Sequence, residues 1–261
     1  MLPAITSLQN PTVKNLVRLR RRRQRDRQRL MLIDGLRALE LALKNGFRVE
    51  TVFAAEDALS GDWRQRPWFG GARVQPVSGA VFSKIGYGDT PDGVLGLAPQ
   101  PAFELRALPV PPRPLYVVAE GLEKPGNLGA ILRSADAAGA SGIIVCDSRT
   151  DICNPNVVRA SRGALFTVPV AQTSTPAALR WLRERGVQVL AAAPDAGRPY
   201  TGADMSRPTA LAVGAEQRGL SETWLAETPV SIPMTGQVDS LNVAQTASVL
   251  LFEAVRQRAA L

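Results

Sequence analysis

Polar side chains lie beside glycines in three segments of the second half of the chain, residues 120–129 (EGLEKPGNLG), 213–220 (VGAEQRGL) and 232–243 (IPMTGQVDSLNV). Each segment follows an apolar run typical of a strand, and α/β proteins bind ligands in the loops after their strands. The first segment lacks the Gly-Lys-Ser/Thr of a phosphate loop, and its glycine spacing does not fit the dinucleotide fingerprint. Its glycines indicate a tight turn from strand to helix, with Asn127 as the helix N-cap. Arg133 lies six residues further on and by itself would be assigned to a surface ion pair.

The composition excludes several kinds of catalysis. The chain contains no histidine, which rules out Ser–His or Cys–His nucleophile activation and zinc sites with imidazole ligands. Its two cysteines cannot form a four-thiolate zinc site. Cys146 and Cys153 could pair, but 261 residues can build a core that needs no disulfide. We therefore expect two buried or inert thiols in a reducing compartment.

The positive charge of the chain lies at its N-terminal end. Hydrophobic residues make up 45% of the sequence and charged residues 21%, which predicts a folded protein. The net charge is +8, and the first 50 residues hold 12 Lys/Arg against 4 Asp/Glu, so the excess is wholly N-terminal. Such an arm suggests a polyanionic partner, either nucleic acid or an anionic membrane surface. Because we find no signal-peptide pattern and no apolar run of roughly 18 residues, we expect a soluble, cytoplasmic protein.

An arginine run dominates this basic arm. Between Arg18 and Arg29, eight of twelve residues are arginine. On a helix they would surround nearly the whole circumference and leave nothing apolar to bury. One interpretation is a solvated, self-repelling surface helix. We favour a phosphate-binding arm, because guanidinium groups bind phosphate oxygens bidentately and concentrated like charge is unfavourable unless a partner compensates it.

The first hundred residues predict a small α/β unit. Asn10-Pro11 is a typical helix start, and a second helical stretch runs from Asp34-Gly35 to Asn45-Gly46. Residues 49–55, 74–77 and 94–98 have the composition of short strands. Six prolines between Pro99 and Pro114 predict an extended connector. The expected organisation is a domain at 1–98, a linker at 99–114 and a second domain at 115–261.

The second domain alternates between strand and helix patterns. Strands are expected at 115–119, 142–146, 187–193, 211–213 and 230–232, and helices at 127–138, 177–185 and 242–258. This alternation predicts a mostly parallel sheet covered by helices.

Together the three glycine-containing segments resemble the three motifs of the SpoU (TrmH) branch of the SPOUT RNA methyltransferases. The motifs are N-x-G-x-x-x-R, G-x-E-x-x-G-L and I-P-M-x-G-x-x-x-S-L-N-V, and the likeness covers residues 115–258. The upstream part, with its basic helix and the segments Leu32–Gly35 and Thr90–Val94, looks like the L30e-like substrate domain of many rRNA members. Asp34 stands where that domain more often has Glu.

The resemblance implies an α/β-knot fold, a mostly parallel sheet with helices on both faces and a deep trefoil knot, plus a small L30e-like N-terminal domain. It implies S-adenosylmethionine (AdoMet)-dependent methylation of a ribose 2′-hydroxyl in structured RNA, most often 23S rRNA, by a homodimer that needs no metal and no membrane. The alternatives are a tRNA ribose methyltransferase and a catalytically silent RNA-binding or ribosome-assembly protein.

The resemblance also assigns site residues. The catalytic positions are Asn127, Arg133, Glu216, Ser240 and Asn242, and the cofactor-binding positions are Gly214, Gly219, Ile232, Met234 and Leu241. The expected RNA-binding residues are Arg18, Arg20, Arg21, Arg22, Arg23, Arg25 and Arg159, with Asn156 and Ser161 as weaker candidates that could equally belong to a helix start. A guanidinium normally stays protonated. We therefore expect Arg133 to bind the target phosphate and steady the developing alkoxide, with Glu216 as the alternative proton acceptor.

Overall fold

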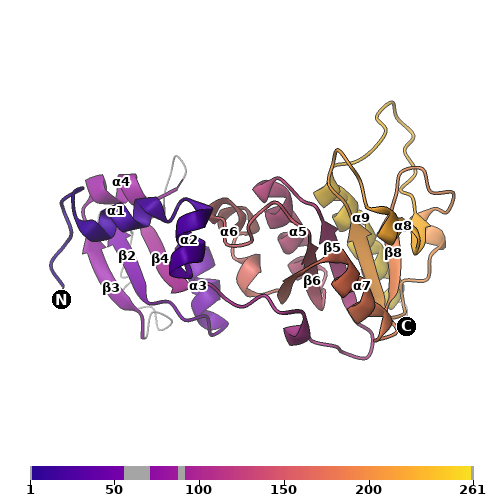
Figure 1. Ribbon diagram of the computed structural model, residues 1–261, viewed down its shortest axis with the longest axis horizontal. Coiled ribbons are helices and arrows are strands. Elements are labelled where there is room, and N and C mark those ends of the chain that lie inside the picture. Colours follow the sequence, from indigo (N-terminus) through magenta and orange to yellow (C-terminus); the bar gives the residue numbers. More distant parts are fainter. Residues whose placement is uncertain (1, 56–70, 88–91, 260–261) are drawn as a thin grey trace. The chain divides into compact units, whose positions relative to one another are not determined.

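The computed structural model describes residues 2–55, 71–87 and 92–259 (Figure 1). The chain divides into two compact units. The N-terminal unit comprises the chain up to Pro101 together with Asp151–Thr167, and the C-terminal unit comprises Ala102–Thr150 and the chain from Val168 onward. The boundary at residue 101 lies inside the expected linker. The assignment of residues 151–167 differs from the expected one, because this segment packs with the N-terminal unit although its sequence position is between two strands of the C-terminal unit.

The N-terminal unit combines a four-stranded mixed sheet with helices in its described residues. The sheet order is β1-β4-β2-β3, with β4 antiparallel to β1 and β2, and β2 parallel to β3. Its elements are α1 (Pro11–Arg18), α2 (Arg22–Gln28), β1 (Leu30–Asp34), α3 (Leu36–Lys44), β2 (Thr51–Ala55), β3 (Arg73–Val77), α4 (Gly79–Ile85), β4 (Val94–Pro99), α6 (Pro155–Ser161) and the 3₁₀ turn η5 (Ala164–Phe166). The predicted helix start is confirmed, since the Asn10 side chain accepts a hydrogen bond from Thr12 N at 2.8 Å.

The arginine run differs from the expected single helix. Arg18 is the last residue of α1, Arg22–Gln28 form α2, and Arg29, which directly follows α2, has a left-handed φ of 53°. Leu19, the second residue of the run, is fully buried in the same core as the apolar residues Val13 and Leu16. The run therefore contributes to the core of its unit as well as to its surface.

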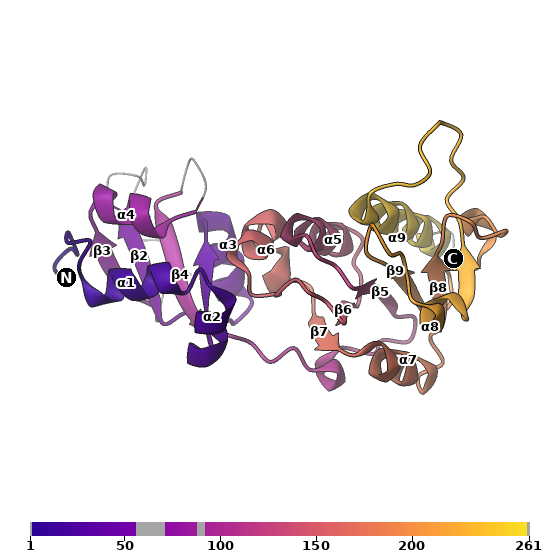
Figure 2. The same cartoon turned by 45° about the horizontal axis from the view of Figure 1, so that its top comes forward.

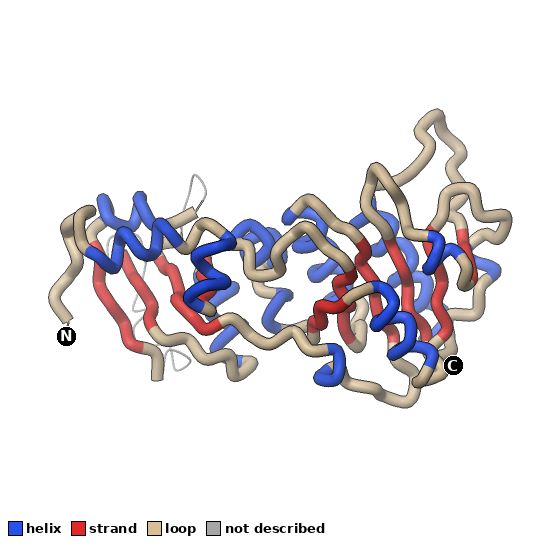
Figure 3. The backbone as a smooth tube through the Cα atoms, viewed as in Figure 1, coloured by secondary structure: helices blue, strands red, loops and turns tan. Residues whose placement is uncertain are grey.

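The C-terminal unit contains an all-parallel sheet whose six described strands have the order β10-β8-β9-β5-β6-β7 (Figure 3). Its elements are η4 (Leu105–Ala107), β5 (Leu115–Glu120), α5 (Pro125–Ala137), β6 (Gly142–Cys146), β7 (Val170–Thr173), α7 (Thr175–Arg183), β8 (Gln188–Ala192), η6 (Tyr200–Gly202), β9 (Thr209–Val213), α8 (Glu222–Leu225), β10 (Thr228–Val230) and α9 (Val243–Ala259). The predicted parallel sheet is confirmed.

Helices cover both faces of this sheet. Figure 2 shows α5 and α9 on one face and α7 and α8 on the other. On the α5–α9 face, Ser134 and Ser248 are hydrogen-bonded through their hydroxyls at 2.6 Å. On the other face, Trp181 of α7 and Trp224 of α8 join a core with Tyr116 and Val118 of β5.

The order of the strands fixes where a ligand site can form. From β5 the chain continues to β6 and β7 on one side, whereas β8, β9 and β10 lie on the other. The direction of winding therefore reverses beside β5, and in parallel sheets the crevice at such a reversal, outside the carboxyl ends of the strands, is the usual ligand site. The loops that leave β5, β8, β9 and β10 all emerge at this edge.

Candidate functional site

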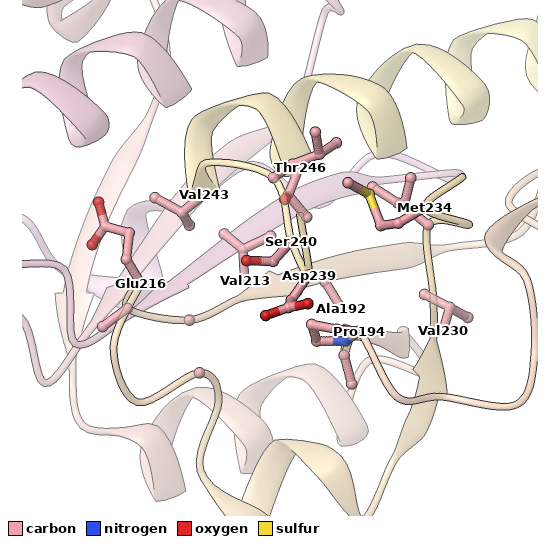
Figure 4. Close-up of a pocket in the computed structure, with 16 residues that line it drawn as sticks. Ala192, Pro194, Val213, Glu216, Val230, Met234, Asp239, Ser240, Val243 and Thr246 are labelled. Atoms are coloured by element: carbon pink, nitrogen blue, oxygen red, sulfur yellow. The ribbon is translucent and has the colours of Figure 1, made fainter. Parts of the chain in front are cut away.

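A pocket opens in the C-terminal unit at the carboxyl ends of the parallel strands (Figure 4). It encloses about 660 Å³ of space, part of it open to solvent. All five residues expected to bind the cofactor line it, namely Gly214, Gly219, Ile232, Met234 and Leu241. The second and third motifs, which are separated in the sequence, thus form the walls of one pocket.

Sequence reasoning missed several lining residues. Ala192, Ala193 and Pro194, at the end of β8, form part of the wall, and so do Asp239 and Thr246. Figure 4 shows the Asp239 carboxylate among the lining side chains. The available signal was the position of residues 192–194 at the carboxyl end of a strand, but the sequence did not indicate that β8 adjoins β9 and β10.

The loop between Gly214 and Gly219 closes on itself. A Cβ atom at Gly214 would lie 2.2 Å from the backbone of Gly219, so no larger residue fits without moving the loop. Gly219 has a φ of +63° and donates its N–H to Ala215 O at 2.8 Å. Glycine is therefore required at both ends of this loop. Gly236 of the third motif, in contrast, has open space around its Cα atom and no positive φ.

Asn127 links the first motif to the other two. Its side-chain amide donates to Glu216 Oε1, and its side-chain carbonyl accepts from Asn242 Nδ2 at 3.2 Å. Asn242 is itself held, because its Oδ1 accepts the Ala244 N–H at 2.9 Å at the start of α9. The prediction of Asn127 as an N-cap is wrong, since α5 begins two residues earlier at Pro125. Proline is favoured at the first helical position, and the amide of Asn127 is thereby left for these contacts.

Ser240 and Arg133 complete the predicted catalytic set in different ways. Ser240 lines the pocket, as does Glu216. Arg133 is exposed on α5, and within the described residues no hydrogen bond or ion pair holds its guanidinium. The structure therefore brings Asn127, Glu216 and Asn242 into contact and places Ser240 in the pocket that Glu216 also lines, but it does not join Arg133 to them.

A smaller pocket adjoins the first motif. Its lining includes Glu123 and Lys124 from the turn after β5, and Glu216 and Arg218 from the loop after β9. Glu123 is paired with Arg149 at 2.8 Å. Glu216 lines both pockets and so stands where they adjoin.

The predicted RNA-binding arginines do not form a uniform group. Arg18, Arg21, Arg22 and Arg23 are exposed. Arg25 is only 1% exposed, and its guanidinium donates to Leu19 O and Arg20 O at 2.8 Å and pairs with Asp151. This burial contradicts the predicted role of Arg25 in RNA binding, because the side chain leaves almost no surface for RNA to contact.

Arg20 and Arg159 also have partners within the N-terminal unit. Arg20 donates to Lys84 O at 3.0 Å and to Gly86 O at 2.7 Å, and lies over the Tyr87 ring at 4.8 Å. Arg159 donates to Tyr87 O and lies 3.7 Å from Asp34 Oδ2. Both side chains retain exposed surface, so they can contribute charge but are held in place.

Among the weaker candidates, Asn156 and Ser161 differ in exposure. Asn156 is exposed, and its N–H is capped by Asn154 Oδ1 at 2.9 Å. Ser161 is 1% exposed and donates to Val158 O at 2.8 Å, which contradicts a role in lining an RNA cleft. Asn154 caps α6, and Asn156 lies in the first turn of that helix.

Asp34 is the buried acid of the N-terminal unit. Burial raises its pKa to about 6, and the nearby Arg159 guanidinium only partly opposes this effect. Its Oδ1 atom has no hydrogen-bond partner in the described part of the chain. The carboxyl is therefore poorly solvated when ionised.

Comparison with known proteins agrees with these features. Residues 114–252 match the SpoU rRNA methylase family and residues 10–96 match the MRM3-like substrate-binding domain. A 23S rRNA (uridine(2479)-2′-O)-methyltransferase of Streptomyces viridochromogenes is 34% identical over 91% of this chain and 86% of its own. An uncharacterized tRNA/rRNA methyltransferase of Synechocystis is 35% identical over 98% and 95%.

Solved structures give the same result. A crystal structure of an RNA 2′-O ribose methyltransferase is 41% identical, with a TM-score of 0.87 over 98% of this chain and 100% of that one. An AdoMet-bound rRNA methyltransferase from Sinorhizobium meliloti is 35% identical, with a TM-score of 0.87 over 97% of both chains. With its three motifs linked by the contacts of Asn127 and a family match over more than half of its length, this chain belongs to the SpoU rRNA methylase family.

Proposed function

We propose that the protein transfers a methyl group from AdoMet to a ribose 2′-hydroxyl of 23S rRNA. The observation that carries the proposal is the contact of Asn127 with Glu216 and Asn242, which brings the three motifs together beside the pocket. The name of the Streptomyces relative supplies the RNA class and the acceptor atom.

The pocket fits AdoMet in its chemistry. Ile232 and Leu241 give apolar surface for an adenine ring, and the main chain at Gly214 and Gly219 can approach a ligand closely. The Asp239 carboxylate accepts hydrogen bonds from ligand hydroxyl or ammonium groups. AdoMet supplies a methyl group already attached to a good leaving group, so the remaining tasks of the protein are to align the hydroxyl and take its proton.

The proton acceptor we assign is Glu216. One of its oxygens accepts from Asn127, and its other oxygen has no hydrogen-bond partner among the described residues. The carboxylate lines both the large pocket and the smaller one beside it, which supports a position between the methyl donor and an incoming ribose. Asn127 fixes its orientation, and Ser240 is positioned to hydrogen-bond the sugar. Arg133 is assigned to the phosphate next to the reacting ribose, since a guanidinium stays protonated.

We assign RNA contacts to cationic side chains in each of the two units. In the C-terminal unit, Lys124 and Arg218 line the smaller pocket beside Glu216, and no ion pair within the described residues holds either of them. We assign them to backbone phosphates of the target. In the N-terminal unit, Arg18, Arg21, Arg22 and Arg23 are exposed and supply sequence-independent attraction.

We also propose that the protein is a cytoplasmic homodimer. Its chain forms a trefoil knot in the segment that builds the pocket. Phe252 on α9 is 51% exposed, and we propose that the partner subunit covers it. Light scattering would give the mass of a dimer for the wild type and of a monomer for Phe252→Glu.

Within residues 2–55, 71–87 and 92–259, no helix has the length and hydropathy to cross a bilayer.

The experiment that tests the proposal is transfer of tritiated methyl groups from AdoMet to total RNA of a strain that lacks the protein. The expected result is label in 23S rRNA at a nucleotide whose 3′ phosphodiester resists alkali, because methylation removes the 2′-hydroxyl that attacks it. Label in tRNA would assign the enzyme to tRNA instead. AdoMet binding without any transfer would favour a catalytically silent RNA-binding protein.

A further inference from the structure

Glu120, the last residue of β5, is a buried carboxylate with four hydrogen bonds. Its Oε1 atom accepts from Thr175 Oγ1 at 2.6 Å, Ser221 Oγ at 2.8 Å and Trp224 Nε1 at 3.1 Å. Its Oε2 atom accepts the Ser221 backbone N–H at 2.7 Å. Glu120 is 8% exposed. Hydrogen bonds to a buried charge are stronger than those between neutral groups, so this is a rigid junction.

Three of these four bonds come from the residues that directly follow the loop of the second motif. Ser221 comes one residue after Leu220, the last residue of the motif, and precedes α8, and Trp224 lies in α8 with no exposed surface. The start of the same loop is fixed beside β5, because Val213 of β9 is in register with Ala119. Both ends of the 214–220 loop are thus attached to the end of one strand.

We propose that Glu120 is a positioning residue for the cofactor pocket. By holding Ser221 and Trp224, it fixes the end of the loop that places Gly219 in the pocket wall and Glu216 against Asn127. The inference rests on the proposed cofactor pocket. A purely structural carboxylate would contribute to stability without altering the affinity of that pocket.

The sharpest variant is Glu120→Gln. An amide has one accepting oxygen and one donating nitrogen, so only one side of it can accept. If the amide nitrogen takes the place of Oε2, its N–H faces the Ser221 N–H, and if it takes the place of Oε1, its N–H faces the Trp224 Nε1–H. Both of these donors belong to the loop anchor, whereas the Thr175 hydroxyl can rotate and accept. The substitution therefore disrupts the anchor and leaves the side chain's volume unchanged.

Thr175→Val is the matched control. It removes one hydrogen bond to the same carboxylate, but the lost donor comes from α7 and not from the loop. Both variants lower the free energy of unfolding. Only Glu120→Gln is expected to raise the Kd for AdoMet, by about tenfold, the effect of one lost buried hydrogen bond.

Isothermal titration with AdoMet, at a temperature where circular dichroism shows both variants folded, provides the first measurement. Amide hydrogen exchange of residues 214–220 provides the second, and it does not depend on cofactor binding. The proposal predicts a weaker Kd and faster exchange in Glu120→Gln, and neither change in Thr175→Val. Equal Kd values and equal exchange in the two variants would overturn it.

A milder variant covers the case in which Glu120→Gln does not fold. Trp224→Phe keeps the buried ring but removes the Nε1 donor, and should accelerate exchange of the 214–220 loop and weaken AdoMet binding severalfold. Wild-type affinity and exchange in that variant would also overturn the proposal. Wild-type protein that binds no AdoMet would contradict the cofactor pocket, whereas the exchange comparison would still test the anchor.

Discussion

The Asn127 amide donates to the Glu216 carboxylate, across 89 positions of sequence, and accepts in turn from Asn242. These three side chains come from the start of α5, the loop after β9 and the residue before α9. A polar chain of this kind fixes the orientation of the carboxylate beside the pocket and leaves one of its oxygens for a substrate.

Glu216→Gln tests the role of this carboxylate. The glutamine carbonyl can still accept from Asn127, so the position is kept while the base is lost. We expect kcat for methyl transfer to fall by about 100-fold or more, the usual contribution of a general base. Glu222→Gln, an exposed acid at the start of α8, is the control and should keep wild-type activity. A kcat within twofold of wild type for Glu216→Gln would remove it as the proton acceptor.

Substitution of Arg25 should lower the free energy of unfolding, whereas substitution of its exposed neighbours should not. Arg25→Met leaves the Asp151 carboxylate without its partner and should cost about 3 kcal/mol in the free energy of unfolding, as broken buried pairs do. Urea unfolding measures this loss. Arg22→Gln changes a side chain that is 53% exposed and should leave the unfolding midpoint in place.

The exposed arginines should instead affect RNA binding. Replacing Arg21, Arg22 and Arg23 by Gln should weaken RNA binding and reduce the slope of log K against log salt by about 2, since each phosphate contact contributes roughly 0.7–0.9. The affinity for AdoMet should not change. An unaltered salt slope in this triple variant would exclude the arm from the RNA interface.

Asp34 predicts a pH dependence of stability. Its pKa is raised by burial from 3.8 to about 6, so the folded protein binds this proton more tightly than the unfolded chain does. The contribution of Asp34 to the free energy of unfolding is therefore fully present below about pH 4 and is lost as the pH rises through 6. This contribution amounts to about 3 kcal/mol at most. Urea unfolding between pH 4 and 7 should show this decline in the wild type and a flatter profile in Asp34→Asn. The same decline in both proteins would show that another group causes it.

The two cysteines should be unreactive in the folded protein. Both are free and buried, as expected from the sequence. Burial raises the pKa of the Cys153 thiol to about 12 and that of Cys146 further still, and the thiol form is a poor nucleophile. An aromatic disulfide reagent at pH 8 should release no chromophore until urea unfolds the chain. Rapid reaction of a native thiol would contradict this burial.

Much of the C-terminal unit could be predicted from its sequence because its strands are continuous apolar runs. The strand predicted at 142–146 and the helix predicted at 242–258 differ from the observed elements by no more than one residue at either end. β7 was missed because it is short and half polar, with the sequence Val-Ala-Gln-Thr. β1 was missed because its apolar run, Leu30–Asp34, directly follows the arginines.

The parts of the site that could not be predicted depend on long-range contacts. The burial of Arg25 requires Asp151, which lies 126 positions away and belongs to a segment that packs with the N-terminal unit. Residues 192–194 became part of the pocket only because β8 lies next to β9 and β10. Local propensity carries no information about either arrangement. The motif residues could be found because their types and spacing, not their neighbours in space, identify them.

The most direct test of the account is a crystal structure of the protein with AdoMet. We predict that the adenosine contacts the main chain at Gly214, Ile232 and Leu241, and that the methyl group faces Glu216 and Ser240. AdoMet bound elsewhere, or bound in this pocket with its methyl group directed away from both side chains, would contradict the account.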